Sequence, residues 1–355
     1  MDIKTYLADF KKEVDREIEA YFDSVIEEVS KRDIFMAKAL KNVESLVLAG
    51  GKRLRPALMY QSYLGVSGKE KKKMLKTSVS VELIHFFLLI HDDIIDRDIK
   101  RHGKDTVHFT YEKLAKKIFP KNNSAHFGNS MAIIIGDMIG ALGNQIIYNS
   151  RFDDKLIVKA LHKLQSIVSY TVVGQAKDIY IQNKGDASEK EVLEMYEYKT
   201  AKYTFEGPLH MGAILGGADE KALVNLSQIA IPLGIAFQIR DDILGLFGSE
   251  KKVGKPVGSD VKEGKQTILL VRALEMASEK QKKILGKILG KKDLTQGELE
   301  SFQEIIKGTG ALDYAKDLIS RKVEESKGFI KSSQIHEESR KFLLGIADFV
   351  GNREI

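Results

Sequence analysis

Two pairs of aspartates stand out in the sequence, because each follows a strongly apolar stretch. They are Asp92-Asp93, with Asp96 four residues after Asp92, and Asp241-Asp242. The four-residue spacing places the carboxylates of Asp92 and Asp96 on one face of a helix. That arrangement repels itself, and a helix dipole opposes it near a helix C-terminus. Carboxylates of this kind suit Mg²⁺, which completes its coordination with water and phosphate oxygens.

The first acidic cluster alone has a second explanation. It could be a solvated helix end whose carboxylates pair with Arg97 and Lys100. The repetition of the layout at Asp241-Asp242 disfavours that explanation. If the two helices face each other across a bundle, we expect their aspartates to form a site for several metal ions and a polyphosphate.

Basic residues with the character of phosphate ligands lie near both clusters. Residues 50–56 read Gly-Gly-Lys-Arg-Leu-Arg-Pro, Arg101 and His102 follow the first cluster, and Lys255 and Lys265 lie in the glycine-rich segment after the second. Arginine forks and lysine point charges both suit phosphate oxygens. The glycine and lysine spacing does not match a Walker A loop, which disfavours an ATPase.

The elements that must position these residues are helices. Apolar residues recur at steps of three and four through most of the chain. The pattern predicts helices over residues 6–26, 34–48, 74–95, 130–150, 155–180, 189–215, 223–246, 267–289, 296–306, 311–332 and 335–350. No strand is needed to explain it. We therefore expect an all-α protein, with one large helical bundle as a single domain over residues 1–355.

Composition narrows the function further. The chain of 355 residues has 5 prolines, no cysteine and a net charge of +6. Scarce proline permits long helices, and the absence of cysteine favours a reducing cytoplasm. The lysine clusters lack the interleaved aromatics of nucleic-acid binders, so we expect no nucleic-acid partner. We also expect no transmembrane segment, since no uninterrupted apolar run reaches the length of a span.

In their order along the chain, the motifs resemble those of the trans-type isoprenyl diphosphate synthases, the polyprenyl synthetase family, most like its short-chain farnesyl and geranylgeranyl members. The matching pieces are residues 50–56, Asp92–Asp96, Gly136-Asp137, Gly174-Gln175 with Asp178, Lys199-Thr200, Phe237-Gln238 before Asp241-Asp242, Gly254-Lys255-Pro256, Gly258-Ser259-Asp260 and Lys265-Gln266-Thr267. The resemblance implies an all-α isoprenoid synthase bundle with a central active-site cavity. It also implies a homodimer.

The resemblance assigns roles residue by residue. Metal ligands would be Asp92, Asp93, Asp96, Asp241 and Asp242, with about three Mg²⁺ ions per site when substrate is bound. Arg101, Lys199, Lys255 and Lys265 would bind diphosphate. Lys52, Arg55, His85 and His102 would bind isopentenyl diphosphate. Thr200 and Gln238 would lie beside the developing carbocation, and catalysis would rest on Asp92, Asp96, Lys199, Thr200, Gln238 and Asp241.

The implied reaction joins isopentenyl diphosphate head-to-tail to an allylic diphosphate. Mg²⁺ and cations stabilise the departing diphosphate, and a dry cavity protects the carbocation from water. In the family, a large residue five positions before the first aspartate closes the cavity floor. Here that residue is Phe87, with Leu88 beside it, which predicts a short-chain product, geranylgeranyl before farnesyl.

Three features depart from the family pattern, one of which is Lys104-Asp105 in place of the common X-Pro before Thr106. The other two concern the acidic motif and the diphosphate site. Gly245 ends the second acidic motif where other members carry an aspartate, and His102 stands where a second arginine is usual.

Three other functions remain open on the sequence: a longer-chain polyprenyl diphosphate synthase, a terpene cyclase or head-to-head enzyme, and a non-catalytic subunit of a heteromeric synthase. The presence of Lys52, Arg55 and His85 speaks against the second, and the intact aspartate pairs speak against the third.

Overall fold

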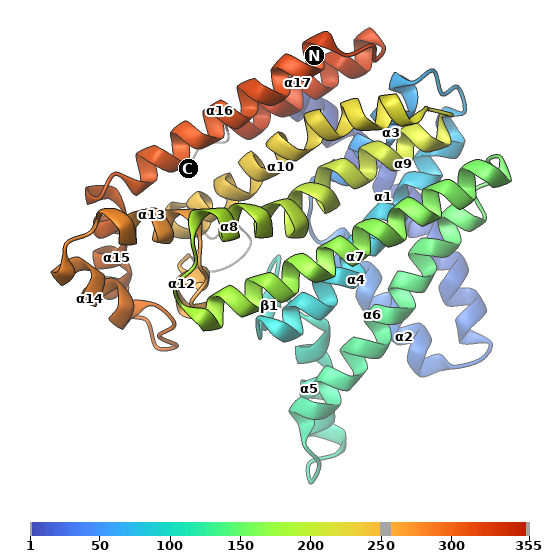
Figure 1. Cartoon of the computed structure of the whole chain (residues 1–355). Coiled ribbons are helices and arrows are strands. Elements are labelled where there is room, and N and C mark those ends of the chain that lie inside the picture. Colours follow the sequence, from blue (N-terminus) through green and yellow to red (C-terminus); the bar gives the residue numbers. More distant parts are fainter. Residues whose placement is uncertain (1, 249–256, 353–355) are drawn as a thin grey trace. The chain divides into compact units, whose positions relative to one another are not determined.

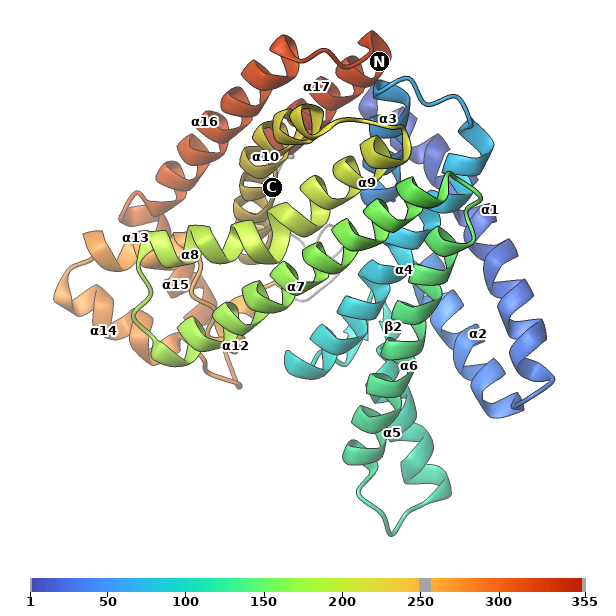
Figure 2. The same ribbon diagram turned by 45° about the vertical axis from the view of Figure 1, so that its right-hand side comes forward.

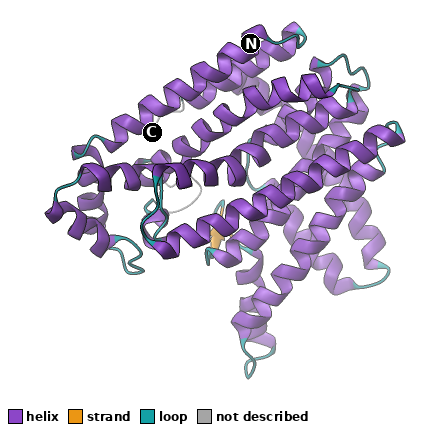
Figure 3. Ribbon diagram, in the orientation of Figure 1, coloured by secondary structure: helices purple, strands orange, loops and turns teal. Residues whose placement is uncertain are grey.

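Helices form almost all of the computed structural model, which describes residues 2–248 and 257–352 (Figures 1 and 3). About half of the described helices begin where a polar side chain accepts a hydrogen bond from the first turn. Asp33, Asn123 and Asp219 do so for α2, α6 and α10. These caps satisfy backbone N–H groups that have no partner inside a helix.

The contacts between residues divide the chain into two compact units, each described here by itself. The N-terminal unit covers Asp2–Leu161 and Ile214–Gly217, and the C-terminal unit covers His162–Ala213 and Ala218–Ile355, with the boundary inside α7. The single-domain assignment over residues 1–355 stays a prediction.

The N-terminal unit is built on one central helix. Its elements are α1 (Ile3–Ser30), α2 (Ile34–Leu48), α3 (Leu54–Gly65), α4 (Lys71–Ile95), β1 (Lys100–Arg101), β2 (Lys104–Asp105), α5 (Val107–Ile118), α6 (Ser124–Tyr148) and the start of α7 (Asp154–Lys184). Helix α4 contacts α1, α3, α5 and α6, and α5 and α6 lie side by side (Figure 2). Because α4 is covered on several sides, its polar residues are held among packed neighbours.

The C-terminal unit is built around α10. Its elements are the rest of α7, α8 (Glu189–Tyr196), η1 (Glu197–Glu206), α9 (Gly207–Leu215), α10 (Glu220–Phe247), α12 (Ser259–Glu263), α13 (Ile268–Met276), α14 (Glu279–Ile288), α15 (Gln296–Gly308), α16 (Ala311–Ser332) and α17 (Glu337–Gly351). Helix α10 contacts η1, α16 and α17. The segment η1 is a π-helix, with a wider turn than an α-helix.

The structure departs from the predicted elements in several places. Two residues on each side of a turn form the antiparallel pair β1–β2, with His102 and Gly103 at positive φ; this suits a tight hairpin turn. The helix predicted over residues 267–289 is interrupted, because Ser278 caps a new helix with a capping box. Helices α3 and α5 were not among the predicted elements.

Two helices, α6 and α10, are long and apolar enough to cross a membrane by length and composition alone. The sequence led us to expect no such segment. In the most apolar part of each helix, 50% of the residues of α6 and 56% of those of α10 are buried inside the structure. That burial fits helices that pack in a protein core.

Candidate active site

The cationic turn at residues 50–56 begins after α2 and ends in the first turn of α3, which contains Arg55. Gly51 has φ of +86°, and Arg53 also has a positive φ of 53° just before α3 begins at Leu54. A non-glycine residue adopts this conformation only when its surroundings hold it. Lys52 is exposed and Arg55 half-buried, whereas Arg53 is buried. The three cations of the turn therefore have different environments.

His85 lies in the middle of α4, where burial and several cationic side chains of this unit lower its pKa. Burial, and then the positive charges of Arg55, Arg101, Arg53 and His102, hold the pKa of His85 well below its usual value. The imidazole is therefore neutral at physiological pH. The structure thus brings four of the predicted substrate-binding side chains, His85, Arg55, Arg101 and His102, into one region of the N-terminal unit.

His102 rests on the glycine turn. A Cβ at position 50 would lie 2.5 Å from the Cγ atom of the His102 ring, so only glycine leaves room for it. Burial, and then Arg101 and Arg53, lower the pKa of His102. Lys104, across the hairpin from Arg101, donates to the backbone oxygen of Ser45 at 3.0 Å. These contacts join the hairpin to the turn and to α2.

The first aspartate motif occupies the last turn of α4. The backbone N–H of Asp96 donates to the oxygen of Asp92 at 2.8 Å, so the two residues are stacked one turn apart as predicted. Arg97, at φ of 58°, ends the helix. Lys100 pairs with Asp105 at 2.7 Å, not with the acidic helix end.

Asp93 has a different environment from its neighbours. It is 4% exposed and accepts hydrogen bonds from Nε and Nη2 of Arg101 at 2.9 and 2.5 Å. Burial disfavours the charge of Arg101, but Asp93 and Asp98 raise its pKa above the usual value. Asp93 is thus an anchor for Arg101, while Asp92 and Asp96 are half-buried at the helix end.

The residues predicted as the cavity floor also lie on α4. Phe87 and Leu88 are half-buried. The Phe87 ring packs against α6, where a Cβ at Gly140 would lie 3.2 Å from it, and meets His91 edge-on at 5.0 Å. Glycine at position 140 therefore gives the phenylalanine its space.

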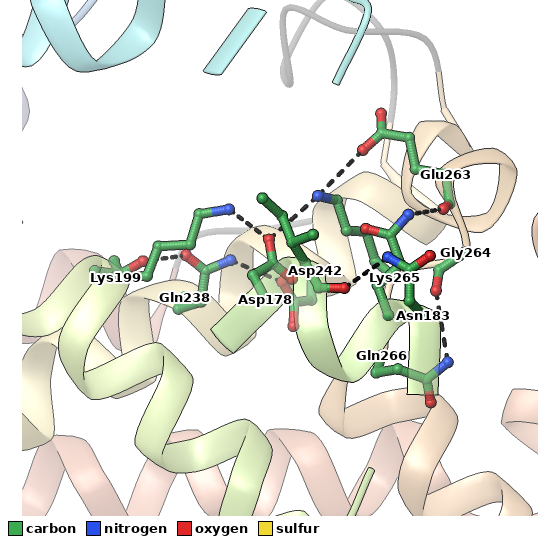
Figure 4. Close-up of polar contacts among 12 residues, drawn as sticks. Asp178, Asn183, Lys199, Gln238, Asp242, Glu263, Gly264, Lys265 and Gln266 are labelled. Carbon is green, nitrogen blue, oxygen red and sulfur yellow. Dashed lines mark hydrogen bonds and ion pairs between the residues drawn. The ribbon is translucent and has the colours of Figure 1, made fainter. Parts of the chain in front are cut away.

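In the C-terminal unit, one buried carboxylate gathers two of the predicted lysines (Figure 4). Asp178 of α7, which is 3% exposed, accepts from Nζ of Lys199 at 2.6 Å and from Nζ of Lys265 at 3.2 Å. Burial acts against its charge, but the two lysines lower the pKa of Asp178. The sequence placed Asp178 in a motif without a role, and the structure shows that it positions both lysines. Lys255 lies outside the described residues.

Lys199 and Thr200 stand on the π-helix η1, which is packed closely against glycines. A Cβ at Gly174 of α7 would collide with the backbone nitrogen of Lys199, and one at Gly234 of α10 would collide with Ala201. The two glycines therefore let η1 approach both neighbouring helices. This approach places Thr200 beside α10, where its hydroxyl donates to Oε1 of Gln238 at 2.6 Å.

The hydrogen bond of Thr200 begins a chain of contacts that ends at the second aspartate motif. Nε2 of Gln238 donates to Asp242 at 2.8 Å, the hydroxyl of Tyr196 donates to the same carboxylate, and the N–H of Ile268 donates to Tyr196 at 2.9 Å. Burial, and then the charge of Asp260, raise the pKa of Asp242 well above its usual value. Asp241 is half-buried beside it.

A small cavity of about 20 Å³ borders Asp242, Asp260 and Lys265, which is room for one water molecule. A Cβ at Gly245 would lie 2.9 Å from the Asp260 carboxylate. The glycine at the end of the second motif therefore leaves the space that Asp260 uses. Tyr196 and Asp260 belong to this site although the sequence gave neither of them a role.

A family model described as polyprenyl synthetase matches residues 37–306, more than half of the chain. The chain belongs to the polyprenyl synthetase family. It is 33% identical over 338 residues to the geranylgeranyl diphosphate synthase of Saccharolobus solfataricus, covering 92% of this chain and 96% of that protein. It is 36% identical over 346 residues to a short chain isoprenyl diphosphate synthase of Methanocaldococcus jannaschii, covering 96% and 94%.

A solved structure is similar over the full length. The geranylgeranyl pyrophosphate synthase of Corynebacterium glutamicum, complexed with isoprenyl diphosphate and magnesium, matches with a TM-score of 0.93 at 29% identity and covers 100% of both chains. These findings confirm the predicted family, the all-α isoprenoid synthase fold and the enzyme class, a trans-prenyltransferase.

Proposed function

We propose that this protein condenses isopentenyl diphosphate head-to-tail with an allylic diphosphate and releases diphosphate, with geranylgeranyl diphosphate as its main product. The observation that carries the proposal is that Arg55, Arg101 and His102 all lie in the region of His85 on α4. The same helix ends in the carboxylates of Asp92 and Asp96. A diphosphate site and a metal site on one helix suit a substrate that is both anionic and metal-bound.

The isopentenyl diphosphate would be held by Lys52, Arg55, His85 and His102. Lys52 and Arg55 supply charge from the turn, and the neutral imidazole of His85 supplies a hydrogen bond without adding to the repulsion between cations. His102 is a weaker cation than the arginine usual at that position, because its pKa is lowered by burial and by Arg101. Its contribution to diphosphate binding should therefore grow under acidic conditions.

The allylic diphosphate would be held by Arg101, Lys199, Lys265 and Lys255. Asp178 holds the ammonium groups of Lys199 and Lys265 close together. The hydroxyl of Thr200 and the carboxamide of Gln238 are joined to each other, and their dipoles would stabilise the positive charge that forms on the allylic carbon.

Magnesium would be held by Asp92 and Asp96 on one side and by Asp241 on the other. These are half-buried oxygen donors, the type that Mg²⁺ prefers. Among the described residues, no group of three or more His, Cys, Asp or Glu side chains is arranged to hold a metal ion by itself; water and diphosphate oxygens would complete the coordination. Bound Mg²⁺ would neutralise the departing diphosphate. We retain three ions per site as part of the proposal, with Asp93 and Asp242 acting mainly through their protein partners.

The chemical steps need no protein nucleophile. The allylic C–O bond breaks, and its electron pair leaves with the diphosphate. The double bond of isopentenyl diphosphate then attacks the carbocation, forming the new C–C bond, and a proton passes to the released diphosphate. The protein contributes cations, fixed dipoles and an apolar surface that keeps water from the carbocation.

Product length would be set by Phe87. Phe87 lies five residues before Asp92, and its ring fills the space beside Gly140. Replacing Phe87 by alanine should lengthen the main product by at least one five-carbon unit, measured by mass spectrometry of the products. Phe35→Ala, on α2, is the matched control and should leave the distribution unchanged. An unchanged distribution in Phe87→Ala would contradict this assignment.

The deciding experiment supplies the purified protein with Mg²⁺, isopentenyl diphosphate and each of the C5, C10 and C15 allylic diphosphates. We expect consumption of isopentenyl diphosphate, release of diphosphate and a C20 product. Products much longer than C20 would favour a longer-chain synthase. No release of diphosphate with any starter would favour a non-catalytic subunit of a heteromeric synthase. We further propose that the protein is a cytoplasmic homodimer of single-domain chains. Sedimentation of the purified protein tests the oligomeric state.

A further inference from the structure

We propose that Arg53 is a positioning residue, which holds Lys52 and Arg55 in their binding geometry by tying their turn to helix α4. This inference rests on the proposed function, because it assumes that Lys52 and Arg55 bind isopentenyl diphosphate. It separates the three cations of the turn into two that face substrate and one that faces the protein.

The guanidinium of Arg53 is occupied by protein on each of its nitrogens. Nε donates to Oδ1 of Asp15 at 2.7 Å, Nη1 to Oε1 of Glu82 at 2.6 Å, and Nη2 to the backbone oxygen of Val47 at 2.7 Å. The side chain of Arg53 is 1% exposed, and those of Asp15 and Glu82 are 20% and 5% exposed. A guanidinium shared between two carboxylates and a carbonyl is poorly placed to bind a diphosphate as well.

The backbone around Arg53 depends on these contacts. Its φ of 53° is unfavourable for a residue with a side chain, so the conformation must be stabilised by the surroundings. A Cβ at Gly51 would lie 3.0 Å from Nη1 of Arg53, so the second glycine of the turn makes room for the guanidinium. Lys52 directly precedes this residue and Arg55 follows two positions later. The backbone that Arg53 stabilises therefore sets the directions of both.

The partners of Arg53 connect the turn to the rest of the site. Glu82 lies on α4, one helical turn before His85 and in the same helix as Asp92. Asp15 lies on α1, outside the residues matched by the family model. The Arg53 cluster thus fixes the isopentenyl diphosphate cations relative to His85, and it gives α1 a part in the site.

The test uses Arg53→Lys and Asp15→Asn, with Asp9→Asn as the matched control. Asp9 is on the same helix as Asp15, but its carboxylate is 64% exposed and pairs with Lys12 at the surface. Lysine keeps the charge of Arg53 and loses the fork that spans both carboxylates. We expect the KM for isopentenyl diphosphate to rise about tenfold in Arg53→Lys, with a smaller rise in Asp15→Asn, while the KM for the allylic diphosphate stays within about twofold.

Calorimetric titration with isopentenyl diphosphate should give the same order of affinities without turnover. A lower melting temperature with unchanged KM for isopentenyl diphosphate would overturn the proposal, as would an equal rise in both KM values. A wild-type protein that binds isopentenyl diphosphate without turning over would overturn the proposed function and leave the positioning role measurable by titration. A wild-type protein that does not bind it at all would overturn both.

Discussion

The two aspartate pairs share one sequence, and the structure divides each pair in the same way but with different chemistry. In both pairs the first aspartate is half-buried and the second is buried. Asp93 is bonded to a cation, Arg101. Asp242 is bonded to neutral groups, the hydroxyl of Tyr196 and the amide of Gln238. Each aspartate pair therefore contains one candidate metal ligand and one framework residue, which is bonded to other protein groups. The partners of the framework residue determine how much it contributes to the free energy of unfolding.

The largest predicted effect is on kcat, and it should follow substitution of the half-buried aspartates, Asp92 and Asp241. Asp92→Asn removes charge from the proposed Mg²⁺ site beside the leaving group, and we expect kcat to fall by at least about 10³-fold. Asp241→Asn should cost less, about 10²-fold, because Asp92 shares its helix face with Asp96 in a two-carboxylate site. Steady-state kinetics at saturating Mg²⁺ measures both, and Asp23→Asn, whose carboxylate is 71% exposed, is the control. Equal activity of Asp92→Asn and wild type would remove Asp92 from the mechanism.

Substitutions of the two buried aspartates, Asp93 and Asp242, should change the free energy of unfolding by different amounts. Asp93→Asn leaves the charge of Arg101 without its main partner in a buried position, so the free energy of unfolding should fall by about 3 kcal/mol. Asp242→Asn keeps an oxygen that accepts from Gln238 and removes an unfavourable buried charge, so the free energy of unfolding should change by less than about 1 kcal/mol. Urea unfolding in metal-free buffer measures both. Equal losses would show that the two framework residues do not differ as their partners suggest.

Close packing at a glycine also distinguishes the region around Lys199 from the region around Phe87. A methyl group at Gly174 meets the backbone of Lys199, which cannot move without displacing η1, whereas one at Gly140 lies 3.2 Å from the ring of Phe87, which has some freedom. Gly174→Ala should therefore reduce the free energy of unfolding by about 2 kcal/mol and raise the KM for the allylic diphosphate. Gly140→Ala should cost less than about 1 kcal/mol.

The control for these glycine variants is Gly286→Ala. No atom lies within 4 Å of a Cβ at that position of α14. The alanine should raise the free energy of unfolding by up to about 1 kcal/mol, because it stiffens the unfolded chain. A loss at Gly286 as large as the loss at Gly174 would refute the packing explanation.

The residues that could be predicted from sequence are those whose signal is local. Helices α2 and α16 match their predicted ends, because their apolar periodicity and the residues at their ends agree. The break at Ser278 was also readable, since Ser278 and Gln281 have the spacing of a capping box. The apolar periodicity on both sides concealed it. The β1–β2 pair is too short to show an alternating pattern.

The residues that could not be predicted act through distant partners. Arg53 has the same neighbours and charge as the cations beside it, and only its contacts with Asp15 and Glu82 show that it faces the protein. Tyr196 is one aromatic residue on a helix, and its bond to Asp242 spans 46 positions. Such partners depend on tertiary packing, for which one sequence carries no signal. The mutual placement of the two aspartate pairs likewise stays a prediction.

The last predicted effect concerns acid stability and a buried histidine of the C-terminal unit. Burial, and then the charge of Lys163, lower the pKa of His210 to about 4. In the unfolded chain the pKa of this histidine is near its ordinary value of 6.5, so the unfolded chain binds more protons than the folded protein between pH 6.5 and pH 4. The stabilising contribution of neutral His210 is therefore present above pH 6.5 and is lost as the pH falls toward 4. At about pH 5 we expect this loss to reach about 1–2 kcal/mol.

His210→Gln should remove that part of the pH dependence, because glutamine keeps a hydrogen-bonding group near Ser227 and does not titrate. His126→Gln, at an exposed position of α6, should leave the acid limb of the stability curve as it is in wild type. Urea unfolding at pH 5 and pH 7.5 measures the difference. His85 in the N-terminal unit is half-buried, and its pKa is also held below the usual value, but there the arginines of the site contribute. An acid limb that persists in His210→Gln would refute the assignment of this loss to His210.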